Sequence, residues 1–267
     1  MRARLGRTDE GRAVAGLRLY DMHVHLGWFA DPASVARDLA ALGVGALAVT
    51  VTPEEHRLLE AALAPEKNVA LAAGLHPWWV RAAPDADALC ELARRVRFVG
   101  EIGLDASPRR VATWDAQLAA FERACAVCAG ASEASAPKVL SIHAVRAAGA
   151  TLDVLERTGA AESCRCVLHW FSGTSEELWR AVRLGCRFSF GERSLATRRG
   201  REYVRVLPAE RLLTETDLPE AEGARTGARE VAASLERAAA GIAAARGTEA
   251  ATVCELTASN AAALLGV

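Results

Sequence analysis

The sequence predicts an α/β protein, a TIM-type (β/α)8 barrel with one extra C-terminal helix, and three observations lead to this class. The length of 267 residues suits such a barrel, which typically takes about 250 residues. Short β-branched apolar runs alternate with longer stretches rich in Ala, Leu, Glu and Arg, as expected for parallel strands buried by crossover helices. Histidine and carboxylate side chains recur at the predicted strand ends, and only a closed barrel gathers these ends around one pocket. We expect residues 1–267 to form this single domain.

Eight strands are expected in order along the chain. They cover residues 17–25, 44–51, 68–75, 98–103, 139–143, 166–170, 186–190 and 212–216. Helical patterns fill each gap between them, and the tail from about residue 228 to 265 reads as two helices separated near Gly247 and Thr248. The first of these completes the eight units, and the second is the extra helix.

Helix start signals support several of the gaps. Asp31 followed by Pro32 is typical of an N-cap with proline in the first turn. Thr52 to Glu55 and Thr174 to Glu177 each follow the capping-box pattern, in which the first hydroxyl and the last carboxylate satisfy free backbone amides.

Composition excludes some classes of protein. Apolar residues make up 51% of the chain, but no uninterrupted apolar run approaches the roughly 18 residues of a membrane span. Residues 1–18 lack the apolar stretch and cleavage site of a secretory signal, so a soluble, cytoplasmic protein without membrane contact is expected. A net charge of −1 gives no overall electrostatic attraction for nucleic acid, so any such contact must be local.

The cysteines are expected to be reduced thiols. Seven is an odd number, and the chain shows no secretory context that would favour a disulfide framework. Cys125 and Cys128 form a CxxC pair within a helical pattern, with no second pair at zinc-finger spacing. We therefore interpret them as small buried apolar residues.

The strand-end side chains predict a metal centre. In His23-Val24-His25 the two imidazoles lie two residues apart on a strand and point the same way, so one metal can take both. Other such side chains each follow an apolar run, where a buried charge needs compensation. These are Glu101, His143, His169 and Asp217. Each alone is more often structural, but their convergence on one pocket favours metal ligands. Only His56, on a helix expected to be exposed, has no evident use.

Five short segments carry a family resemblance. They are His23-Val24-His25, Gly74-Leu75-His76-Pro77, Gly100-Glu101-Ile102-Gly103-Leu104-Asp105, His169-Trp170-Phe171-Ser172-Gly173 and Glu215-Thr216-Asp217. In this order they resemble the TatD family of metal-dependent deoxyribonucleases, within the amidohydrolase-like barrels. The segments around Ser141-Ile142-His143, Val167 to Gly173 and Leu213 to Asp217 are also similar to the QatD subfamily, the TatD-like component of the Qat anti-phage defence system. Qat-system proteins are therefore possible partners.

The resemblance implies two divalent metal ions and a phosphodiester hydrolase. By the family's pattern, one ion is held by His23, His25, Glu101 and Asp217, and the second by Glu101, His143 and His169. Glu101 then bridges the ions, Asp217 is the candidate general base, and His76 is a candidate for contacting the phosphate or leaving group, a structural role being equally open. Zinc, manganese, magnesium and iron all remain open, because such ligand sets accept each of them.

Two departures from the family pattern concern substrate contacts more than metal binding. Gly27 stands where the family usually has an acidic residue. Val145 stands where it often has an arginine, and Arg146 is expected to point elsewhere.

Candidate substrate contacts follow the strand-end histidines. Trp28-Phe29, Trp78-Trp79 and Trp170-Phe171 are expected to ring the pocket mouth, where aromatic rings can stack on bases of a single-stranded DNA end; loop packing is the alternative. Ser172 lies before a predicted helix and could offer backbone amides to a phosphate or merely cap the helix. An arginine-rich stretch from Arg193 to Arg211 could guide a phosphate backbone, although a solvated helix face is favoured.

Three functions remain open at this stage. The first is a TatD-like nuclease, an exonuclease on DNA ends. The second is an amidohydrolase that cleaves a C–N or ester bond, because the same barrel and metal pair support both chemistries. The third is a metal-binding subunit of a defence complex with weak or no activity of its own, which the complete ligand set argues against.

Overall fold

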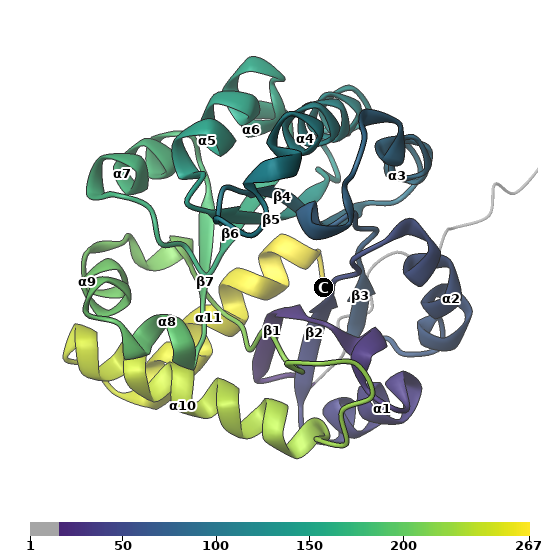
Figure 1. Ribbon diagram of the computed structural model, residues 1–267. Coiled ribbons are helices and arrows are strands. Elements are labelled where there is room, and N and C mark those ends of the chain that lie inside the picture. The colour runs from purple at the N-terminus through teal and green to yellow at the C-terminus, as the bar shows by residue number, and fades with distance from the viewer. Residues whose placement is uncertain (1–15) are drawn as a thin grey trace, which may run out of the picture.

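Eight parallel strands form the centre of the protein, and helices surround them (Figure 1). The computed structural model describes residues 16–267, so the first fifteen residues of the expected domain, and most of the segment tested for a secretory signal, lie outside the described residues. The strands are β1 (Leu19–Val24), β2 (Val44–Ala48), β3 (Val69–Leu71), β4 (Phe98–Asp105), β5 (Val139–Val145), β6 (Arg165–His169), β7 (Arg187–Phe190) and β8 (Leu212–Thr214). All eight predicted strands are present.

The principal helices lie between and after the strands. They are α1 (Pro32–Ala41), α2 (Pro53–Leu63), α3 (Ala86–Ala93), α4 (Trp114–Gly130), α5 (Ala148–Arg157), α6 (Ala160–Ser163), α7 (Ser175–Arg183), α8 (Glu192–Ala196), α9 (Arg198–Val206), α10 (Ala228–Arg246) and α11 (Ala250–Leu265). The two-helix tail is confirmed. Within residues 16–267 no helix is both long enough and apolar enough to span a membrane.

The predicted caps are confirmed with one local difference. The Asp31 carboxylate accepts from Ser34 N, and the Thr52 hydroxyl accepts from Glu55 N. Glu55 departs from a standard capping box because its own carboxylate accepts from Val51 N, one residue before the cap. The box from Thr174 to Glu177 forms as predicted.

The barrel closes through two seams between otherwise separate ladders of three and five strands. Beyond the end of β3, Ala73 N donates to Phe98 O at 3.1 Å, and Gly100 N donates to Ala73 O at 2.9 Å. Beyond the end of β8, Asp217 N donates to His23 O at 2.9 Å. The expected closed barrel is therefore confirmed, although β3 is much shorter than predicted because the seam takes over its second half.

The extra helix α11 closes the bottom of the barrel. Ala261, Leu264 and Leu265 pack against interior side chains from the first halves of the strands, among them Tyr20 and Val139. In Figure 1 the helix lies across the ring of strands. Because this end is filled by apolar side chains, the carboxyl ends of the strands are left as the face where a ligand can enter.

Candidate metal centre

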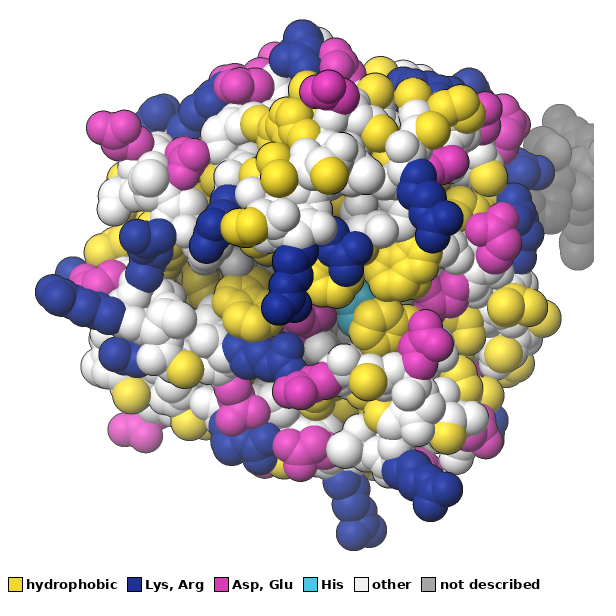
Figure 2. Space-filling model, viewed as in Figure 1, with side chains coloured by type: hydrophobic (Ala, Val, Ile, Leu, Met, Phe, Trp, Pro, Cys, Tyr) yellow, Lys and Arg dark blue, Asp and Glu magenta, His cyan; other side chains and the backbone are white. Residues whose placement is uncertain are grey.

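A cavity of about 370 Å³ opens at the carboxyl ends of the strands. Figure 2 shows a hollow on this face with a histidine at its bottom, hydrophobic side chains beside it and basic side chains around it. Every predicted metal ligand except His23 lines the cavity, and so do the predicted substrate contacts His76, Trp78, Trp170 and Ser172. His23 is completely buried just beneath it.

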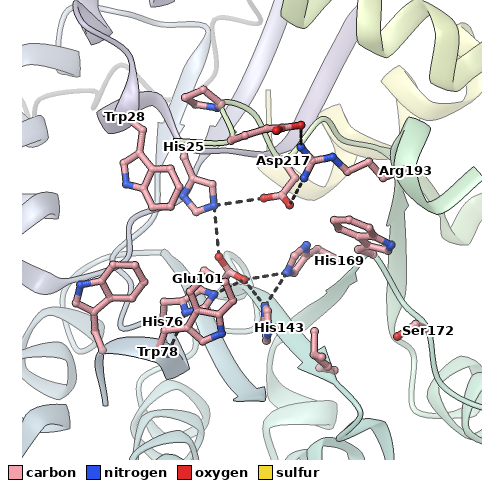
Figure 3. Close-up of a pocket in the computed structure, with 16 residues that line it drawn as sticks. His25, Trp28, His76, Trp78, Glu101, His143, His169, Ser172, Arg193 and Asp217 are labelled. Carbon is pink, nitrogen blue, oxygen red and sulfur yellow. Dashed lines mark hydrogen bonds and ion pairs between the residues drawn. The ribbon is translucent and has the colours of Figure 1, made fainter. Parts of the chain in front are cut away.

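Glu101 lies at the centre of the imidazoles, and its two oxygens face different sets of them (Figure 3). Oε2 is 3.3 Å from His23 Nε2 and 3.5 Å from His25 Nε2. Oε1 is 2.7 Å from His143 Nδ1 and 2.9 Å from His169 Nε2. One carboxylate thus separates two groups of nitrogen donors.

The backbone around Glu101 fixes this central position. Its amide donates to Thr50 O at 2.9 Å, and its carbonyl accepts from Leu75 N at 3.0 Å. Burial alone would raise the pKa of Glu101, but the surrounding imidazoles, above all His76 and His23, lower it well below its usual range. The residue is therefore a carboxylate over the whole neutral range.

Asp217 completes the side that His23 and His25 occupy. Its Oδ1 is 3.4 Å from His25 Nε2 and 3.8 Å from His23 Nε2. Burial favours the neutral acid, but the hydrogen bond with His25 and the nearby imidazoles lower the pKa of Asp217 to about 2. Its backbone is left-handed, with φ of 58°. This uncommon conformation for a non-glycine residue turns the side chain inward at the strand end.

The Nε2 atom of His23 is placed to bind a metal. His23 Nδ1 lies 2.9 Å from the Ser141 hydroxyl, which leaves Nε2 to face the carboxylates. That buried Nε2 has no hydrogen-bond partner among the described residues. A neutral imidazole oriented by its other nitrogen, with a bare nitrogen beside two carboxylates, is the usual arrangement of a metal-ligating histidine. His/Glu clusters able to bind a metal occur here in three overlapping groups, one of them His23, His25 and Glu101.

His143 is oriented in the opposite sense. Its Nδ1 faces Glu101, while Nε2 lies 3.4 Å from Asp105 Oδ2. Burial alone would lower the pKa of His143, but the hydrogen bonds with Asp105 and Glu101 raise it to about 9. In the absence of a cation, this imidazole therefore holds a proton at neutral pH.

His76 is better placed as a hydrogen-bond donor than as a ligand. Trp78 N donates to His76 Nδ1 at 3.0 Å, so Nδ1 is unprotonated and a neutral ring carries its proton on Nε2. Nε2 lies 3.3 Å from Glu101 Oε1. Burial lowers the pKa of His76 to about 4, so the ring is neutral. With its proton on Nε2, it can donate toward the cavity but cannot offer that nitrogen to a metal.

Glu215 is a site residue that the ligand prediction missed. Its Oε1 accepts from Trp170 N at 3.1 Å, its Oε2 bonds the Ser189 hydroxyl, and Oε2 lies 3.9 Å from His169 Nδ1. Burial outweighs these hydrogen bonds and raises the pKa of Glu215 well above its usual range. The only signal in the sequence was its place in the Glu215-Thr216-Asp217 segment.

The aromatic expectation is half right. Trp78 and Trp79 are exposed and line the cavity with nearly parallel rings 6.4 Å apart, and Trp170 lines the cavity beside Arg193. Trp28 also lines the cavity, but it stacks on His25 with ring centroids 4.5 Å apart. The expectation is wrong for the second member of two pairs. Phe29 and Phe171 are buried in the core.

The two departures from the family pattern have structural counterparts. A side chain at Gly27 would collide with Glu55, whose Oε1 would lie 2.3 Å from a Cβ atom there. A carboxylate from α2 thus occupies the space beside the first histidine pair. Val145 lines the cavity, whereas Arg146 is exposed outside it, as expected.

Most of the arginine stretch has structural partners. Arg199 donates to Ser172 O, Arg201 to Leu195 O, and Arg211 to Gly185 O. Of the stretch, only Arg193 lines the cavity.

The expectation that His56 is exposed is wrong: it is only 3% exposed, because it lies on the face of α2 turned to the core.

The cysteine interpretation agrees with the structure. Cys125 and Cys128 are free and buried in α4, and burial raises the pKa of both thiols. They are therefore packing residues far from thiolate chemistry.

Comparison with known proteins identifies relatives. The model of a family described as TatD related DNase matches residues 20–266. The chain is 36% identical to the 3′-5′ ssDNA/RNA exonuclease TatD of Edwardsiella piscicida, over 55% of this chain and 56% of that protein. It thus spans little more than half of that relative's length. It is 34% identical to the uncharacterized metal-dependent hydrolase TatD of Mycobacterium tuberculosis, over 75% of this chain and 80% of that protein.

A solved structure shows the same fold. The TatD homologue YJJV from Escherichia coli K12 matches with a TM-score of 0.71 and 23% sequence identity, covering 94% of this chain and 99% of that one. The barrel described above is therefore the barrel of this family of structures.

Proposed function

The chain belongs to the TatD related DNase family, and from this premise we propose that it is a divalent-metal-dependent phosphodiester hydrolase that trims DNA ends. The division of Glu101 between two imidazole groups is the observation that carries the proposal. Oε2 faces His23 and His25, and Oε1 faces His143 and His169. A carboxylate in this position suits a bridge between two ions.

We assign one ion to His23, His25, Glu101 and Asp217, and the other to Glu101, His143 and His169. When bound, two divalent ions supply Lewis-acid stabilisation of the phosphate and lower the pKa of water. Zinc, manganese and magnesium all suit the donors, which are imidazole and carboxylate alone.

The roles of the chain's own groups follow from their places. Asp217 is ionised and holds its carboxylate at the cavity surface, where it can accept a proton from an attacking water. His76 carries its proton on Nε2 and can donate to a phosphate or leaving oxygen. Trp78 and Trp170 line the cavity and offer stacking faces for bases, and Ser172 lines the same cavity.

Finer parts of the proposal concern substrate and context. A cavity of about 370 Å³ is at the small end of ligand sites and suits one terminal unit of a strand, which favours an exonuclease. The Edwardsiella relative is named as such an enzyme. We propose a cytoplasmic role within a Qat-type defence complex on the motif resemblance alone, with residues 1–267 as one catalytic domain.

A hydrolase of C–N or ester bonds is the second candidate, because the same barrel and metal pair support both chemistries. A metal-binding subunit without activity is the third. The ionised Asp217 and the proton on His76 Nε2 favour an enzyme over the third candidate, because an inactive subunit needs neither.

The test is a cleavage assay with manganese, magnesium or zinc on end-labelled single-stranded DNA and RNA, beside Glu101→Ala. We expect wild type to shorten the labelled strand and Glu101→Ala, still folded by circular dichroism, to lose turnover, because the residue serves both ions. Turnover retained by purified Glu101→Ala would contradict the bridging role. Wild type that holds metal but cleaves neither polymer would shift the proposal to a small-molecule substrate or a partner-activated subunit.

A further inference from the structure

Arg193 is the one arginine or lysine that lines the cavity within residues 16–267. It stands in the first turn of α8, directly after β7, and its side chain reaches toward Asp217 from the side opposite Trp28 and Trp78 (Figure 3). Its guanidinium carbon lies 5.6 Å from the centre of the Trp170 ring, and Nη1 lies 4.0 Å from Asp217 Oδ2. The positive charge is thus held beside the proposed base.

The partners of Arg193 are unlike those of its neighbours in the sequence. Arg199, Arg201 and Arg211 donate to main-chain carbonyls, which ties them to the fold. The recorded partners of Arg193 are carboxylates at the cavity, Asp217 and Glu220, and an aromatic face. A planar guanidinium on an aromatic face with its donors directed at oxygen anions is the arrangement that suits a phosphate.

The pair with Glu220 is exchangeable. The Glu220 side chain is 74% exposed and that of Arg193 is 38% exposed. Ion pairs so open to solvent contribute little to stability. A phosphate oxygen that enters the cavity can therefore replace Glu220 at small cost.

We propose that Arg193 binds a phosphoryl oxygen of a nucleic-acid end and that Glu220 competes with this phosphate. The inference rests on the proposed function, because it names the phosphate contact of the same site. The structural alternative is that the Arg193–Glu220 pair merely fastens the loop after β8 to α8.

The first experiment measures binding without cleavage. Fluorescence anisotropy of a labelled oligo-dT strand in EDTA compares wild type, Arg193→Ala, Glu220→Gln and the double variant, with Arg198→Ala as the matched control. Arg198 belongs to the same stretch, is exposed and lies outside the cavity. We expect Arg193→Ala to weaken binding about tenfold and to flatten the slope of log K against log salt by about 0.7, the value for one phosphate contact on a single strand.

The double variant separates the two roles. Glu220→Gln should tighten binding in the wild-type background and have no effect once Arg193 is replaced by alanine. If Arg193→Ala matches Arg198→Ala in both affinity and salt slope, or if Glu220→Gln acts equally in both backgrounds, the phosphate contact is wrong. If the Arg193–Glu220 pair only fastens the loop after β8, Arg193→Ala and Glu220→Gln should weaken DNA binding equally, and that result would also overturn the phosphate contact.

Failure of the inference is distinct from failure of the proposed function. Cleavage by wild type with an unchanged KM in Arg193→Ala overturns the contact and leaves the nuclease. If wild type cleaves no nucleic acid, the proposed nuclease activity is wrong, and binding of thymidine 5′-monophosphate then tests the phosphate contact. The contact is supported if this nucleotide binds wild type more tightly than it binds Arg193→Ala, and more tightly than thymidine binds wild type. Equal binding rejects it.

Discussion

At the scale of single residues, the roles of two imidazoles of the centre, His23 and His76, follow from the hydrogen-bond partner of the nitrogen that faces away from Glu101. His23 Nδ1 lies 2.9 Å from the Ser141 hydroxyl, and metal binding through Nε2 requires the ring proton to be on Nδ1, where it is donated to this hydroxyl. The amide of Trp78 donates to His76 Nδ1, which leaves the proton of that ring on Nε2. Two histidines about equally close to Glu101 thus differ in function because one is held by an acceptor and the other by a donor.

Removal of the Ser141 hydroxyl should weaken metal binding. Without its acceptor, His23 loses its fixed tautomer and orientation, and loss of such a partner typically weakens metal affinity by about 10- to 100-fold. Competition with a chromophoric chelator would measure the affinity of Ser141→Ala. Thr257→Ala, which removes a buried hydroxyl of α11 bonded to Val253 O, serves as control. Equal affinities for the two variants would refute the orienting role.

Metal affinity should rise with pH up to about 9. Hydrogen bonds with Asp105 and Glu101 overcome the effect of burial and raise the pKa of His143 to about 9, so a metal must displace its proton. Log K should therefore rise by about one for each pH unit below that value.

In the metal-free protein, the same group contributes stability that is complete below pH 6.5 and lost as pH rises through about 9. Titrations from pH 6.5 to 8.5 test this, and a flat profile would contradict it.

At the scale of elements, the ends of the strands are where the backbone departs from ordinary conformations. Arg146, Trp170 and Asp217, which follow or end β5, β6 and β8, all have positive φ. Such left-handed residues cost on the order of 1–3 kcal/mol each and persist only where their surroundings hold them. Here the hydrogen bonds of Trp170 N to Glu215 and of Asp217 N to His23 O do so.

The N-cap of α7 allows the contribution of a single helix cap to stability to be measured. Thr174 caps this helix by accepting from Glu177 N, just after the loop that carries Ser172. Thr174→Ala should lower the free energy of unfolding by about 1 kcal/mol in urea denaturation. Glu176→Ala, on the same turn but without a role in the capping box, should have a smaller effect. A larger loss from the control would show that the cap contributes little.

At the scale of the whole molecule, the barrel brings together residues that are far apart in the chain. The two seams close the ring, α11 fills one end, and the imidazoles and carboxylates gather at the other. Several buried charges in one place are costly without a cation. The folded state should therefore depend on metal more than its apolar core suggests.

Chelation is expected to lower the thermal stability. An ion at about 100 times its Kd stabilises the folded state by about 2.7 kcal/mol, which corresponds to a Tm change of roughly 5 °C or more for a domain of this size. Calorimetry of wild type with metal and with EDTA would show the difference. Glu101→Ala should show little change on chelation, because it lacks the carboxylate common to both proposed sites. An equal change in both proteins would argue against metal at this centre.

The secondary structure was largely predictable because local patterns dictate it. The eight strands, the helix caps at Asp31, Thr52 and Thr174 and the two-helix tail all follow from apolar period and cap chemistry. The predictions that were wrong depend on which face a side chain takes. Phe29 and Phe171 turn into the core, and His56 lies on the buried face of its helix. His56 shares the helical spacing of the buried Leu59 and Leu63, so the period of α2 did carry its signal, whereas Phe29 and Phe171 lie outside any helix or strand and have no such pattern.

By itself, the sequence determined the class of fold, the order of the elements and the set of histidines and carboxylates at strand ends. The tertiary structure alone decided which oxygen of Glu101 faces which imidazoles, that His76 is a donor, and that Arg193 enters the cavity. The physical reason is the distance along the chain over which each interaction acts. Period and caps act within a few residues, whereas tautomers and ion pairs depend on contacts between strands that only closure of the barrel creates.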